Sequence, residues 1–65
     1  MGKQLKALEC ISNDQTLPGG IVDWASGLYD KLIDRNASVR VIDLIALEYY
    51  MHNDSYQLIE RAIIS

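Results

Sequence analysis

The stretch that decides the fold is Val39–Met51, with the sequence VRVIDLIALEYYM. Its only charged residues are Arg40, Asp43 and Glu48. On a helix, one narrow stripe holds Arg40, Asp43, Leu47, Tyr50 and, beyond the stretch, Asp54; most of the remaining circumference is apolar. A helix apolar over so much of its surface must be covered by neighbours on several sides. We therefore expect the rest of the chain to be arranged around this segment.

A β-strand is the alternative for the same stretch, because VRVIDLI is rich in β-branched residues. Strict alternation of apolar and polar residues breaks at Ile42, however, and the apolar character continues to Tyr50. A run of this length favours a helix.

Three further helices are expected on either side. Residues 3–12 carry Leu5, Leu8 and Ile11 at about three-residue spacing, and residues 21–35 show the clearest helical periodicity. The linker before 21–35 contains Pro18-Gly19-Gly20, so that helix should begin between residues 19 and 21. Residues 55–64 form the last expected helix.

Polar residues between these segments supply the expected helix ends. Ser38, or alternatively Asn36, is expected to cap the central helix, and Asn36 also suits a left-handed residue after 21–35. Asp54 and Gln57 have the spacing of a capping box. The sequence thus predicts one all-α domain over residues 1–65, a small bundle of three to four short helices.

Length and composition predict self-association. A core of 65 residues rarely supplies more than about 3–5 kcal/mol of net stability without further support. Cys10 is the only cysteine, so no disulfide forms within one chain, and one Cys with one His cannot complete a zinc site. Because 49% of the residues are hydrophobic, we expect a homodimer.

Charge favours protein partners over nucleic acid. The formal net charge is −3, and the six basic residues are scattered along the chain. Nucleic-acid affinity depends largely on clustered cations that neutralise phosphates. The lone thiol suits a reducing cytoplasm, and neither a signal peptide nor an apolar run of about 18 residues is seen. We expect a cytoplasmic protein without membrane association.

No catalytic, metal or cofactor site is predicted. Cys10 lies on the apolar side of residues 3–12, where we expect a buried small hydrophobe, and His52 suits a helix C-terminus. A calcium loop starting at Asp34 fails, because Val39 replaces its glycine and Ile45 its bidentate Glu. We expect a non-enzymatic protein.

A helix-turn-helix that binds DNA is the alternative function. Ile45–Met51 and Tyr56–Ile63 would be its two helices. The turn between them contains no glycine, and Arg61 is the only cation on the second helix.

Helix-face docking is the mechanism that we expect for a regulatory protein. Two surfaces are predicted. The dimer and core face consists of Trp24, Leu28, Leu32, Ile42, Ile45 and Tyr49. The partner-facing candidates, on the narrow stripe, are Asp43, Leu47 and Tyr50.

Asp43–Glu48 (DLIALE), a polar break and Leu58–Arg61 (LIER) resemble the second half of the small acidic helical connector proteins of enterobacteria, which are associated with biofilm and acid-resistance regulation. In size and texture the chain is also similar to small early-region proteins of temperate lambda-like phages. The resemblance covers about half the chain and departs at the Trp24 helix and the Pro18-Gly19-Gly20 linker. It implies a dimeric helical regulator that binds other proteins, and it transfers no site residue.

Overall fold

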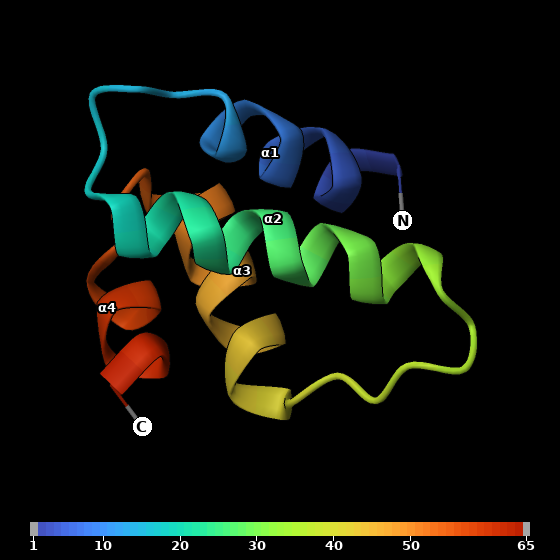
Figure 1. Cartoon of the computed structure of the whole chain (residues 1–65). Coiled ribbons are helices and arrows are strands. Elements are labelled where there is room, and N and C mark those ends of the chain that lie inside the picture. The colour runs from blue at the N-terminus through green and yellow to red at the C-terminus, as the bar shows by residue number, and fades with distance from the viewer. Residues whose placement is uncertain (1, 65) are drawn as a thin grey trace.

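The computed structural model describes residues 2–64, which form four helices and no strand. They are α1 (Gly2–Ser12), α2 (Gly19–Ile33), α3 (Val41–Asn53) and α4 (Gln57–Ile64) (Figure 1). The expected all-α fold is confirmed, and the strand interpretation of the central stretch is wrong. The helix that forms there has 13 residues, which is longer than the roughly 3–10 residues of a typical strand.

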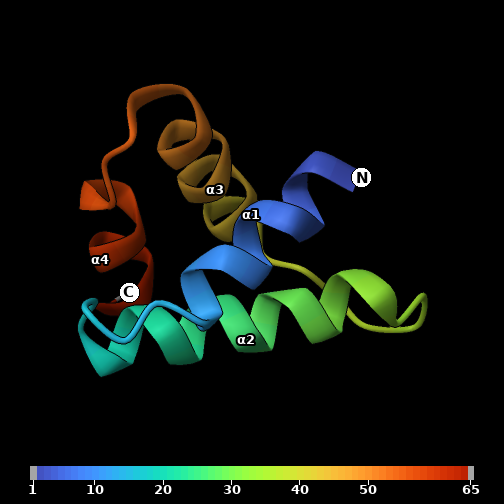
Figure 2. The same cartoon turned by 90° about the horizontal axis from the view of Figure 1, so that it is seen from above.

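The helices pack as two pairs. α1 lies on α2 and α3 lies on α4, and the pairs meet where α2 contacts α4 and α1 contacts α3. Figure 2 shows α4 beside the beginning of α2, with α1 near α3. At that end of the molecule, a methyl group built on Gly20 would lie 3.9 Å from Cδ1 of Ile63. This arrangement encloses one core.

The core takes two or three side chains from each helix at helical spacing. Leu8 and Ile11 come from α1. In α2, the buried residues Ile21, Ala25 and Leu28 are four and then three residues apart. The buried hydrophobic residues of the core are Leu8, Ile11, Ile21, Ala25, Leu28, Ala46, Leu47, Ile59 and Ala62.

The N-terminus of α3 differs from the expectation. α3 begins at Val41 rather than Val39, and its N-cap residue is Arg40, which makes no side-chain cap. Neither Ser38 nor Asn36 caps the helix. Instead, the Asn36 N–H donates to Oδ1 of Asp34 at 3.0 Å, which holds a turn before α3.

The turn between α3 and α4 also differs. Asp54 adopts a left-handed conformation with φ 52°, and its N–H donates to the Tyr50 carbonyl at 2.8 Å. Asp54 therefore ends α3 and forms no capping box with Gln57, where α4 begins. Among residues 2–64 it is the only non-glycine residue with positive φ, so the left-handed role expected for Asn36 is wrong.

Replacing Leu47 by Ala is expected to destabilise the fold severely. Leu47 has no exposed surface, and a Leu→Ala change in a core lowers the free energy of unfolding by about 2–5 kcal/mol. Because that approaches the whole net stability of so small a chain, the variant should be largely unfolded at 25 °C by circular dichroism.

Ile33→Ala provides the matched control. Ile33 is 57% exposed, and substitutions at such positions usually change stability by less than about 1 kcal/mol. Equal losses for the two variants would contradict the placement of Leu47 in the core.

Candidate docking face on helices α3 and α4

Among residues 2–64, Asp43 is the charged residue that is buried, with 4% of its surface exposed. The Trp24 indole Nε1 donates to its Oδ1 at 2.9 Å. The Arg40 guanidinium donates to both carboxylate oxygens, from Nε to Oδ2 at 3.1 Å and from Nη2 to Oδ1 at 2.9 Å. Nη2 also donates to the Ala62 carbonyl at 3.0 Å. This cluster joins α2, α3 and α4.

The cluster keeps the Asp43 carboxyl charged at neutral pH. Burial alone raises the pKa of Asp43, but hydrogen bonds from Arg40 and Trp24 and the positive charges of Arg40 and Lys31 hold that pKa below its usual value. The first turn of α3 is also a favourable place for a carboxylate. The hydrogen bonds and negative charge of Asp43 in turn raise the pKa of Arg40.

The inward direction of Asp43 decides which side of α3 faces out. Asp43 and Leu47 are four residues apart and both point into the core, so the opposite side of the helix lies at the surface. That side carries Val41, Ile42 and Ile45, which are 69%, 38% and 54% exposed. α3 therefore presents large β-branched side chains to water.

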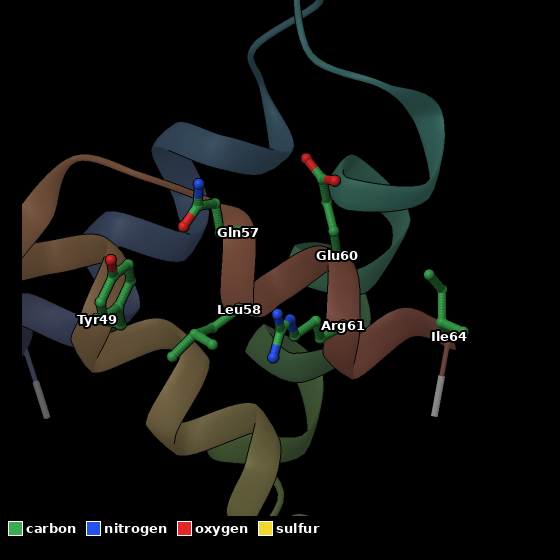
Figure 3. Close-up of a pocket in the computed structure, with 6 residues that line it drawn as sticks. All are labelled: Tyr49, Gln57, Leu58, Glu60, Arg61 and Ile64. Atoms are coloured by element: carbon green, nitrogen blue, oxygen red, sulfur yellow. The ribbon is translucent and has the colours of Figure 1, made fainter.

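The apolar surface continues from α3 onto α4. Ile45 and Tyr49 line one hollow with Leu58. Tyr49 and Leu58 also line a second hollow with Arg61 and Ile64 (Figure 3). We call this combined surface the α3–α4 face, which consists of Val41, Ile42, Ile45 and Tyr49 from α3 and Leu58, Arg61 and Ile64 from α4.

Polar and charged side chains of both signs lie at the two sides of this face, and Glu60 lines the same hollow as Arg61. On the α1 side, Glu48 accepts a hydrogen bond from Gln4 Nε2 at 3.2 Å and lies 3.3 Å from Nε2 of His52. On the α4 side, Figure 3 shows Arg61 between Leu58 and Ile64. Arg61 forms no ion pair with any residue between 2 and 64.

The predicted dimer and core face divides between the interior and the surface. Leu28 is buried in the core, and Trp24 and Leu32 pack against it half-buried. Ile42 and Ile45 are exposed, with Tyr49 half-buried beside them. The α2 residues therefore belong to the core, whereas the role of the α3 residues in a dimer stays a prediction.

The partner-facing assignment of Asp43, Leu47 and Tyr50 needs correction. Asp43 and Leu47 are buried, and Tyr50 packs half-buried against the core. Burial raises the pKa of Tyr50, and the nearby Asp54 carboxylate adds to this. The stripe that bears Asp43 faces inward because the carboxylate finds hydrogen-bond donors there.

Several residues of the α3–α4 face escaped the sequence interpretation. Nothing in the local pattern singles out Val41 or Leu58 as part of a docking face. The three-residue spacing of Arg40 and Asp43 was the available signal, because a paired carboxylate can be buried where an unpaired one cannot.

The remaining candidates from the sequence are the lone cysteine, a metal site and a membrane-spanning helix. Cys10 is exposed, which corrects its expected burial, because α1 buries the stripe of Leu8 and Ile11 instead. Between residues 2 and 64, no cluster of three or more His, Cys, Asp or Glu side chains could hold a metal ion. Over the same residues, no helix combines the length and apolar character needed to cross a bilayer.

No protein-family model, curated protein or solved structure matches this chain. The function is therefore inferred from the geometry and chemistry of the α3–α4 face.

The stability of the fold is expected to fall as the pH falls through the acidic range. Because the pKa of Asp43 is lower in the folded state, its ionised form stabilises the fold above the unfolded pKa of about 3.9. This contribution is lost as the pH drops through the folded pKa. Urea unfolding followed by Trp24 fluorescence between pH 7 and pH 3 measures it.

Asp43→Asn is the variant that isolates this term. It should lower the free energy of unfolding at pH 7 by about 2 kcal/mol, because Arg40 loses its charged acceptor, and it should flatten the acid dependence. Asp30→Asn, at an exposed carboxylate, is the control. Asp14 also has a lowered pKa through its Thr16 hydrogen bonds, so the difference between wild type and variant is the relevant quantity. An unchanged acid dependence in Asp43→Asn would contradict this role.

Proposed function

We propose that this chain is a small non-enzymatic regulatory protein that acts by protein–protein interaction through the α3–α4 face and works as a homodimer in the cytoplasm. The observation that carries the proposal is the exposure of Val41, Ile42 and Ile45 along one side of α3. Contiguous apolar surface with polar residues at its edge is typical of an interaction site.

The residue pattern on α3 supports docking. Ile42, Ile45 and Tyr49 have the i, i+3, i+7 spacing of anchor residues in helix-mediated recognition. Tyrosine is enriched at interfaces because it combines a large apolar ring with a polar hydroxyl. Covering these side chains removes apolar area from water, which is favourable by about 25 cal/mol per Å².

The size of the molecule is compatible with such an interface. A stable complex buries about 800 Å² on each partner, which is roughly a sixth of the 4520 Å² surface of this chain. The outer sides of two helices are the natural source of that area. The likeness of the Asp43–Glu48 and Leu58–Arg61 segments to the connector proteins is in keeping with a dimeric regulator.

Ile45→Asp is expected to abolish the dimer without unfolding the protein. Size-exclusion chromatography with light scattering at about 50 μM should give a dimeric mass for wild type and a monomeric mass for the variant. The charge would need to be desolvated in the interface, whereas Ile45 is 54% exposed in the single chain.

Ile33→Asp is the matched control. Ile33 is similarly exposed, at 57%, but lies at the end of α2 outside the α3–α4 face. It should remain dimeric. A monomeric wild type would contradict the homodimer, and a dimeric Ile45→Asp would contradict the choice of face.

DNA binding is the second candidate, and the turn between α3 and α4 favours it. Three residues separate the two helices, and the first, Asp54, adopts the left-handed conformation for which a helix-turn-helix often uses glycine. The charge opposes it, because Glu60 lies beside Arg61 and the net charge is −3.

A salt titration separates the two candidates. Fluorescence anisotropy with a labelled DNA duplex should show no binding at 50 mM salt if the protein acts through other proteins. A DNA-binding regulator would instead bind with an affinity that falls steeply from 50 to 200 mM salt and weakens in Arg61→Ala.

A further inference from the structure

We draw no further inference here: the strongest candidate, the exposed apolar side of α3 with the hollows that it forms with α4, belongs to the docking face already described, and nothing in the structure shows what covers it, since Glu60 and Arg61 line the same hollow and give it no single charge for a partner to match.

Discussion

The buried Asp43 carboxylate is the constraint on which this small fold depends. A charge removed from water is strongly unfavourable unless donors replace the lost hydration. Trp24 provides a donor from α2, and Arg40 provides charged donors while also binding the Ala62 carbonyl of α4. One polar cluster therefore sets the positions of three helices relative to one another.

The orientation of α3 follows from that cluster. A helix with apolar residues around most of its circumference has several nearly equivalent ways to face a core, so hydrophobic burial alone selects weakly among them. The pairing of Asp43 selects one of them, in which Leu47 is buried and Val41 and Ile45 are exposed. The chain thus satisfies its buried charge by leaving apolar surface in contact with water.

The direction of α4 turns this exposed side of a helix into a surface shared by two helices. The left-handed Asp54 ends α3 abruptly, and the short turn brings Leu58 beside Tyr49. The Arg40 contact with Ala62 holds the far end of α4 against the start of α3. Turn and contact together give the α3–α4 face its width and place Arg61 at its edge.

Periodicity in the sequence was enough to determine four helices, the linker at Pro18 and the inward side of α2, because these depend on local spacing of apolar residues. The resemblance of two short segments to the connector proteins added the hypothesis of a dimeric regulator. This hypothesis stays a prediction. Tertiary structure alone decided the helix ends near Asp54 and Val41, the exposure of Cys10 and the inward side of α3. The physical reason is that the partners of Asp43 come from α2 and from the residue preceding α3, and a carboxylate that the pattern places on a polar stripe becomes a core residue only when those donors surround it.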